Sequence, residues 1–444
     1  MTEESQATFF RQSGWVALAT VLGGVFLIAV HIVATSQMGM DGPEYSVFVT
    51  LLRVQLLISV PAAGLQVMFA SQTASATSPK ELRQLTTSIR RIVFIIFILW
   101  LVFIAILAFA QSFNLDLLQL LKIQNPAAAW LTLVVGLVSL LLPALRGVLT
   151  GRQDFWGLGW SIVLDGVVRF ALVMVAMMLG HQAAGGMAGV LAGILTALAL
   201  TWWLLRDLPW REREPIDWRP WVKRALPLAI CPGVMVLMFS ADVLFVQATF
   251  SDKQTFFYMP AATVGLALFL FVTPLATVMF PKLVSSRTRG KDTSALKLAL
   301  GGTAILGGLA VTTLFLVPEL PLWIIYFKNP VYWKSAPLVT KYIAALYPLL
   351  LANVLIGNLL AKERFGARPC IMLVILAMGY AGALIWQQPQ LLEMVGNVTL
   401  AKNQLAPATQ EAFLQIILTF GGFNIVILAL SVGLTWWLTK TDQS

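Results

Sequence analysis

Four charged residues lie inside long apolar stretches of this sequence and are its first candidates for chemistry: Arg53, Asp165, Arg169 and Asp242. A charge at the centre of a bilayer costs about 2.5–3.5 kcal/mol on the insertion scale, so it needs a partner, water or a substrate. Arg53 has no acid one turn away, and its planar fork suits a phosphate group. We expect Arg53 to bind an anionic substrate, with pairing to a buried acid or to carbonyls as the alternative.

Asp165 and Arg169 are four residues apart, so on one helix they share a face and can neutralise each other. A structural ion pair is the simpler interpretation. The other is a latch from which Arg169 is released to bind an anionic substrate. Asp242 has no cation within a turn, which leaves three interpretations: a proton or sodium acceptor that couples or gates, a partner of Arg53, or a hydrated carboxylate.

A polar stripe marks the first apolar segment at spacings of 7, 4, 7 and 4 residues, which places its members on one helical face: Ser13, Thr20, Gly24, His31 and Thr35. On a membrane helix such a stripe predicts a cavity wall, lined here by Ser13, Thr20 and Thr35. His31 is a further coupling or gating candidate, because its charge can change near neutral pH. A hydrogen-bonded helix contact is the simpler alternative for His31.

The elements that carry these residues follow from composition. Of the 444 residues 59% are apolar and 11% charged, and the mean hydropathy is +0.83, whereas a soluble domain carries about a quarter charged residues. The sequence therefore predicts an all-α polytopic membrane protein. The two cysteines, Cys231 and Cys370, cannot build a disulfide framework or a metal quartet. We expect no catalytic residue, metal or cofactor.

Since a helix needs about 20 apolar residues to cross the bilayer, the sequence predicts twelve spans. These are residues 13–38, 44–72, 92–111, 128–150, 157–180, 184–205, 226–250, 256–281, 296–318, 338–361, 370–387 and 412–438. A charged, Trp- and Pro-rich stretch at 206–224 divides them six and six. We expect an N-lobe at 1–208, a cytoplasmic interfacial linker at 209–224 and a C-lobe at 225–444.

Orientation follows from the basic residues. Of the 30 Lys and Arg residues, 22 lie at the termini or in every second loop, counting Arg146, and six lie in the opposite loops. Because cytoplasmic loops are enriched in Lys and Arg, both termini are predicted to be cytoplasmic. The net charge of +10 reflects this bias, and we expect no nucleic-acid partner.

Two segments occur twice. GVLTGRQDF at 147–155 returns as GNLLAKERF at 357–365, and the second span aligns with the eighth at an offset of 213, matching Tyr45 with Tyr258 and Pro61 with Pro274. Six spans are an even number, so both copies cross the membrane in the same sense. The repeat predicts two lobes related by a pseudo-two-fold axis along the membrane normal, with a substrate site between them.

Two structural details complete the pattern. Gly185, Gly189 and Gly193 are four residues apart, which favours close helix contact. The aromatic stretch ELPLWIIYFKNPVYWK at 319–334 is typical of a segment lying at the external interface.

Two longer stretches carry a family resemblance. Residues 144–173, ALRGVLTGRQDFWGLGWSIVLDGVVRFALV, hold an Arg-Gly-x-Leu-x-Gly turn, a Phe and a mid-helix Arg. Residues 241–283 hold an Asp before an apolar strip, a Tyr opening the next span and a Phe-Pro-Lys close. Both stretches resemble the polysaccharide-exporter branch of the MOP superfamily, the Wzx-like lipid-linked oligosaccharide flippases.

The resemblance implies a V of two six-helix lobes, with spans one, two, seven and eight lining the cleft. It also implies a flippase of polyprenyl-diphosphate-linked oligosaccharide that works by alternating access in polysaccharide biosynthesis at the bacterial inner membrane. Proton or sodium coupling and contacts with polysaccharide polymerase and glycosyltransferases are implied with it.

Two other classes of protein remain as alternatives. The first is a MATE-like ion-coupled drug or metabolite antiporter, whose cation-exporting members carry an acid on span one. This chain has His31 there, and Arg53 would repel a cationic substrate. The second is a membrane enzyme, against which stand the short loops and the lack of a paired-carboxylate, His or metal cluster.

Overall fold

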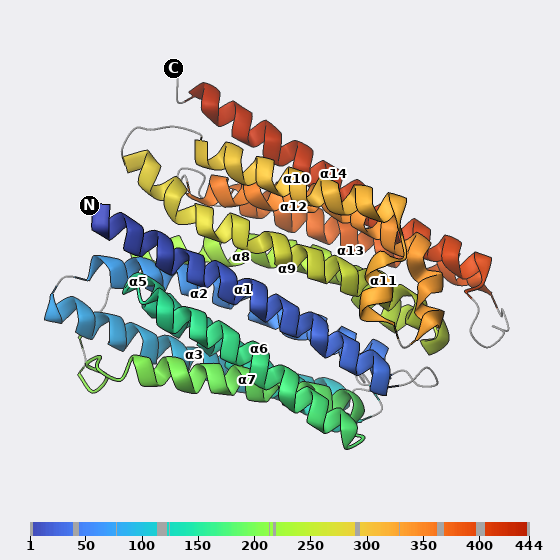
Figure 1. Ribbon diagram of the computed structural model, residues 1–444, viewed down its shortest axis with the longest axis horizontal. Helices are drawn as coiled ribbons and strands as arrows, with labels where there is room; N and C mark the ends of the chain where they lie inside the picture. Colours follow the sequence, from blue (N-terminus) through green and yellow to red (C-terminus); the bar gives the residue numbers. More distant parts are fainter. Residues whose placement is uncertain are drawn as a thin grey trace. The chain divides into compact units, whose positions relative to one another are not determined.

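The structure is a computed structural model, and it describes residues 3–38, 44–76, 78–112, 122–123, 125–212, 214–215, 219–288, 294–327, 329–361, 368–396 and 405–441. All regular elements within these ranges are helices (Figure 1). Twelve of the helices have between 23 and 37 residues. They are α1 (Glu3–Gln37), α2 (Glu44–Ser75), α3 (Pro79–Ser112), α5 (Pro126–Gly151), α6 (Phe155–Met178), α7 (Gln182–Leu204), α8 (Arg219–Thr249), α9 (Asp252–Thr288), α10 (Ser294–Leu316), α12 (Ala336–Ala361), α13 (Arg368–Val395) and α14 (Pro407–Thr441).

Each predicted span lies on one of these helices. Ten helices are long and apolar enough to cross a membrane, and α2 adds an eleventh candidate as a pair of segments, Glu44–Ser59 and Gly64–Ala74, bent by 41°. Pro61 lies at this bend, and its missing N–H removes a hydrogen bond of the helix. The remaining predicted span, the eighth at residues 256–281, lies on α9, which is not among these candidates. The chain is a multi-pass membrane protein.

The helices divide into two compact units. Unit 1 comprises Met1–Met38 and Leu51–Ile230, and unit 2 comprises Gly39–Thr50 and Cys231–Ser444. The first turns of α2 are thus counted with unit 2 and the rest of α2 with unit 1. The predicted lobe boundaries, 1–208 and 225–444, stay a prediction.

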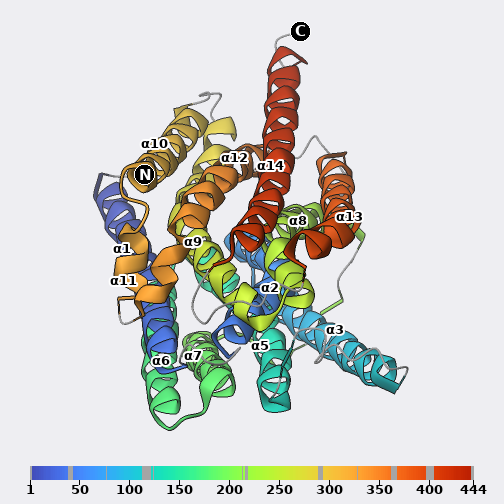
Figure 2. The ribbon, with the colours of Figure 1, turned by 90° about the vertical axis from the view of Figure 1, so that its right-hand side faces the viewer.

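Within unit 1, α6 packs between α1 and α7 (Figures 1 and 2). Glycines allow the close approach of α7. A Cβ added to Gly193 would lie 2.5 Å from the carbonyl oxygen of Asp165, and one added to Gly189 would collide with Val173. The predicted close contact along this glycine stripe is therefore confirmed.

The stretch GVLTGRQDF forms the corner between α5 and α6. A Cβ on Gly147 would collide with the backbone oxygen of Gln66 on α2, so this glycine sets how closely α5 approaches α2. Arg152 follows α5 and donates two hydrogen bonds to Asp207, at 2.9 and 2.6 Å. These bonds lower the pKa of the Asp207 carboxyl, so the pair persists at neutral pH and is lost only in acid.

The second copy of this stretch differs. Among the residues that the structure describes, none outside its own helix turn lies within 4 Å of a Cβ added to Gly357. Residues 362–367, which hold the rest of GNLLAKERF beyond Ala361, lie outside the described residues.

The start of the predicted linker is tied to α3. Pro209 accepts a hydrogen bond from the Thr86 hydroxyl at 3.1 Å, and the carbonyl of Glu212 accepts one from Arg90 at 2.8 Å. An exposed ion pair of 2.8 Å joins Arg83 to the Glu212 carboxylate. This part of the linker therefore packs on unit 1, while residues 213 and 216–218 lie outside the described part of the chain.

Within unit 2, α12 packs against α9, α10 and α14. The aromatic stretch at 319–334 forms the short helix α11 (Leu320–Ile325) and the 3-10 helix η1 (Pro330–Ser335). The expectation of a simple interfacial segment is wrong for its tyrosines. Tyr326 and Tyr332 are buried, and Tyr326 shares a 2.8 Å hydrogen bond with Tyr45, while Trp323 stays exposed.

Candidate functional site

The predicted pairing of Asp165 with Arg169 on α6 is confirmed by the structure. The Arg169 guanidinium donates to the Asp165 carboxylate at 2.8 Å, with about 15% of each side chain exposed. A second guanidinium joins them from α5: Arg146 lies 3.7 Å from the other carboxylate oxygen, and 16% of its side chain is exposed. We call Arg146, Asp165 and Arg169 the basic cluster.

Arg146 is fixed by α6 as well. Its Nε donates to the hydroxyl of Ser161 at 3.0 Å, and a terminal nitrogen donates to the Ser161 carbonyl at 2.9 Å. The Ser161 hydroxyl lies 3.1 Å from that of Thr201 on α7. The cluster is therefore held by three helices of unit 1.

Arg146 is not predicted as a site residue, because its place near the end of a span assigns it to the basic residues of a cytoplasmic loop. The residue lies within α5, and this is a correction to the count of basic loop residues. A signal was present: Arg146 and Ser161 lie equally far from the corner at 153–154, and residues equidistant from the turn face each other in an antiparallel helix pair.

The cluster carries more positive than negative charge, since two guanidinium groups share one carboxylate. Charge-assisted hydrogen bonds from arginine to phosphate or carboxylate are strong and often bidentate. A partly exposed cluster of this kind can bind one end of an anion while Asp165 keeps the arginines in place. The geometry suits binding better than acid–base catalysis.

Arg53 lies on α2 in the same unit, fully buried. His31 on α1 is also buried, and Arg53 is close enough to it to interact electrostatically. The sequence placed these two residues on different spans without predicting that they are neighbours. Their proposed roles, substrate binding for Arg53 and coupling or gating for His31, stay predictions.

The polar stripe of α1 is partly described. The hydroxyls of Thr20 and Thr35 donate to carbonyls of their own helix, those of Val16 and Ile32, at 2.8 and 3.0 Å. Within the described part of the chain, no atom outside the backbone of its own helix turn lies within 4 Å of a Cβ added to Gly24. The side chain of Ser13 lies outside the described part, and the cavity wall stays a prediction.

Asp242 on α8 is fully buried in unit 2. It accepts a 2.7 Å hydrogen bond from the hydroxyl of Tyr258 on α9. Tyr380 on α13 interacts with it electrostatically, and Tyr342 on α12 packs edge-on against Tyr258 with ring centroids 6.1 Å apart. We call these four residues the tyrosine-lined carboxylate site.

The sequence singles out Asp242 and, both in the internal repeat and in the family resemblance, Tyr258, but it does not predict that tyrosines surround the carboxylate. The repeat partners Tyr45 and Tyr258 have different hydrogen-bond partners. Tyr45 shares hydrogen bonds with Tyr326 and Thr263, whereas Tyr258 donates a hydrogen bond to the Asp242 carboxylate. A buried carboxylate among hydroxyls can exchange a proton or hold a small cation.

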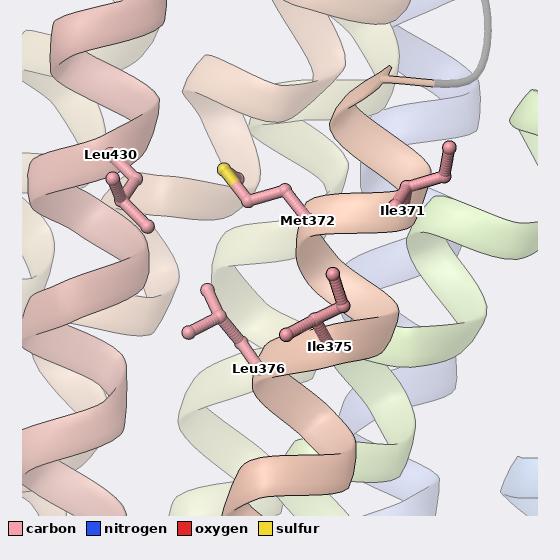
Figure 3. Close-up of a pocket in the computed structure, with 5 residues that line it drawn as sticks. All are labelled: Ile371, Met372, Ile375, Leu376 and Leu430. Atoms are coloured by element: carbon pink, nitrogen blue, oxygen red, sulfur yellow. The ribbon is translucent and has the colours of Figure 1, made fainter.

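A groove of about 420 Å³ lies between α13 and α14 (Figure 3). It is lined by Ile371, Met372, Ile375 and Leu376 of α13 and by Leu430 of α14, all apolar. The groove offers nothing to a charged headgroup. Among the described residues, no three His, Cys, Asp or Glu side chains lie close enough to hold a metal ion.

The fold has solved counterparts at low sequence identity. The chain matches a MATE protein crystallised in complex with MaL6 over 97% of its own length and 96% of that chain, at 17% identity and a TM-score of 0.63. An inward-facing multidrug resistance MATE family transporter of the MOP superfamily matches over 96% of this chain and 99% of its own, at 15% identity and a TM-score of 0.63. The chain has the fold of MOP-superfamily transporters.

A third counterpart is a MOP-superfamily transporter from Pyrococcus furiosus, described as having a binding pocket of reverse polarity that suggests a different function. It matches over 95% of this chain and 94% of its own, at 14% identity and a TM-score of 0.66. No protein-family model and no curated protein sequence matches the chain. The predicted fold class, an all-α multi-pass chain of the MOP type, is confirmed.

Proposed function

We propose that the chain is a transporter that flips polyprenyl-diphosphate-linked oligosaccharide across the bacterial inner membrane by alternating access, with both termini in the cytoplasm. One observation carries the proposal: the basic cluster sets two guanidinium groups against a single carboxylate inside the membrane-spanning part of unit 1. An anionic substrate group offsets the cost of this excess charge.

A diphosphate fits the cluster by its chemistry. Its oxygens can replace the Asp165 carboxylate as the acceptor for Arg169, while Ser161 continues to hold Arg146. Arg169 is then the latch that opens when substrate arrives. Arg53, which interacts electrostatically with His31, supplies a second basic position in unit 1. The polyprenyl tail stays in the lipid throughout.

The tyrosine-lined carboxylate site is the proposed point of coupling. Asp242 takes up a proton or a sodium ion from the gradient, and its charge changes among helices α8, α9, α12 and α13 of unit 2. A change of charge in a buried site alters the preferred packing of the helices around it. Glycosyltransferases would supply the substrate, and polysaccharide polymerase would consume it.

The decisive experiment measures flipping of a fluorescent diphosphate-linked glycolipid in proteoliposomes. We expect Arg53→Ala, Arg146→Ala and Arg169→Ala each to lower the rate by about tenfold or more, as loss of one charge-assisted bond is worth about 1.5–3 kcal/mol. Arg152→Ala is the matched control: it removes an arginine close to Arg146, but one that pairs with exposed Asp207.

The outcomes separate the two transporter classes. Full flipping by well-folded Arg53→Ala protein would remove that residue from the site. Wild-type protein that extrudes lipophilic cations and flips no glycolipid would establish the antiporter. The excess of guanidinium groups disfavours that outcome because it repels cations. The MOP transporter described with a pocket of reverse polarity also fits the view that the fold serves more than drug export.

A further inference from the structure

The only two cysteines of the chain meet in unit 2. Cys231 lies on α8 and Cys370 on α13, 139 positions apart in the sequence, and their sulfur atoms are 2.6 Å apart. Cys231 is fully buried and Cys370 is 5% exposed. Helix packing alone therefore brings both thiols of the protein to one point.

Two thiols that merely touch keep their sulfurs farther apart than this, whereas a disulfide bond brings them to about 2.05 Å. We infer that Cys231 and Cys370 form a reversible disulfide that joins α8 to α13. Only a small movement of either helix is needed for the bond to form. No other cysteine of the chain can compete for either sulfur.

The chemistry is thiol–disulfide exchange with an external disulfide, either a small-molecule disulfide such as oxidised glutathione or a disulfide oxidoreductase. The thiolate of one cysteine attacks that disulfide, forms a mixed disulfide and releases one thiol. The second cysteine then attacks the mixed disulfide and releases the second thiol. Two thiols of the protein are oxidised, one external disulfide is reduced, and the two protons pass to the released thiols.

The position of the pair gives the bond a consequence. Pro232 follows Cys231 directly and lacks a backbone N–H, so α8 lacks one hydrogen bond at this point and can bend there. Farther along the same two helices lie Asp242 on α8 and Tyr380 on α13, both in the tyrosine-lined carboxylate site. A bond at residues 231 and 370 joins the two helices about three turns, or about 15 Å, from that site.

The bond is conditional. The predicted orientation puts the start of α13 near the cytoplasm, where small thiols keep most cysteines reduced. Because Cys231 is fully buried and Cys370 is 5% exposed, exchange with an external thiol or disulfide is slow in both directions, and the bond forms only under sustained oxidising conditions. The bond thus acts as a redox switch on transport. The effect on transport rests on the proposed function, whereas the formation of the bond does not.

The bond itself is tested by counting thiols on the full-length protein. The purified protein is treated with oxidised glutathione, denatured in SDS and labelled with a maleimide-linked polymer that shifts the band once per free thiol. We expect no label before reduction and label on both cysteines after it. Cys231→Ser and Cys370→Ser each leave one cysteine, and we expect neither to form an intramolecular bond. Two labelled cysteines in the treated wild type would overturn the proposal.

The switch is tested by transport in proteoliposomes after the same treatment. We expect oxidised wild type to lose transport rate and to regain it with a reductant, while Cys231→Ala/Cys370→Ala protein responds to neither. A bond that forms and leaves the rate unchanged would overturn the switch. An equal loss in the double variant would do so too. The thiol count needs no substrate, so it stands even if the proposed function fails.

Discussion

At the scale of single residues, Asp165 holds two arginines with one carboxylate, and its removal leaves both without their acid. Losing one partner of a fully buried ion pair costs about 3–5 kcal/mol. Because these side chains are about 15% exposed, we expect Asp165→Asn to cost less, about 2 kcal/mol of unfolding free energy. The measurement is the thermal midpoint in detergent.

Asp207→Asn is the control for this prediction, since it breaks an arginine–carboxylate pair whose side chains are 36% and 55% exposed. Such exposed pairs contribute about 0–1 kcal/mol, so a small shift in the midpoint is expected. Equal shifts in the midpoint for the two variants would mean that the basic cluster contributes no more to stability than the exposed pair of Arg152 and Asp207.

The tyrosine-lined carboxylate site makes a second prediction at this scale. Asp242→Asn cannot ionise, so we expect its transport to stop responding to an imposed proton or sodium gradient. Tyr258→Phe keeps the carboxylate but removes its 2.7 Å donor, and should weaken the response without abolishing it. The measurement is the flipping rate in proteoliposomes with and without each gradient.

Tyr347→Phe is matched to Tyr258→Phe. It removes a hydroxyl of the same unit, but one that donates to the backbone carbonyl of Ala304. We expect its response to the gradients to match the wild type. If Asp242→Asn keeps the wild-type response, Asp242 is not the coupling group.

At the scale of helices, the two copies of the repeated stretch differ in packing: Gly147 allows a close helix contact, whereas Gly357 does not. Gly147→Ala should push α5 away from the backbone of α2 at Gln66 and lower the thermal midpoint. At Gly357 there is open space for a methyl group. We therefore expect Gly357→Ala to stabilise the fold by about 0.4–1 kcal/mol, because it reduces the conformational freedom of the unfolded chain. Midpoints that move in the same direction would show that the Gly147 contact does not control how α5 packs.

At the scale of the whole molecule, the helices could be predicted because each span is a local property of about twenty apolar residues. The pair of Asp165 and Arg169 could be predicted for the same reason, since four residues along a helix fix a contact. Arg146 could not be assigned in this way, because its partners lie on another helix. Likewise, the donor to Asp242 is set by how α9 packs on α8.

The orientation of the whole chain makes the last prediction. Without Arg146, which lies inside α5, twenty-one of the counted basic residues are on the proposed cytoplasmic side against six on the other, and one of these six, Lys341, lies inside α12. This bias is strong enough to set the topology of short loops. We expect a fluorescent protein fused after Ser444 to fold and fluoresce. Alkaline phosphatase fused at Lys402, between α13 and α14, should be active because it is outside. Phosphatase activity at the C-terminus would reverse the orientation, and would place the start of α13, with Cys370, on the oxidising side of the membrane.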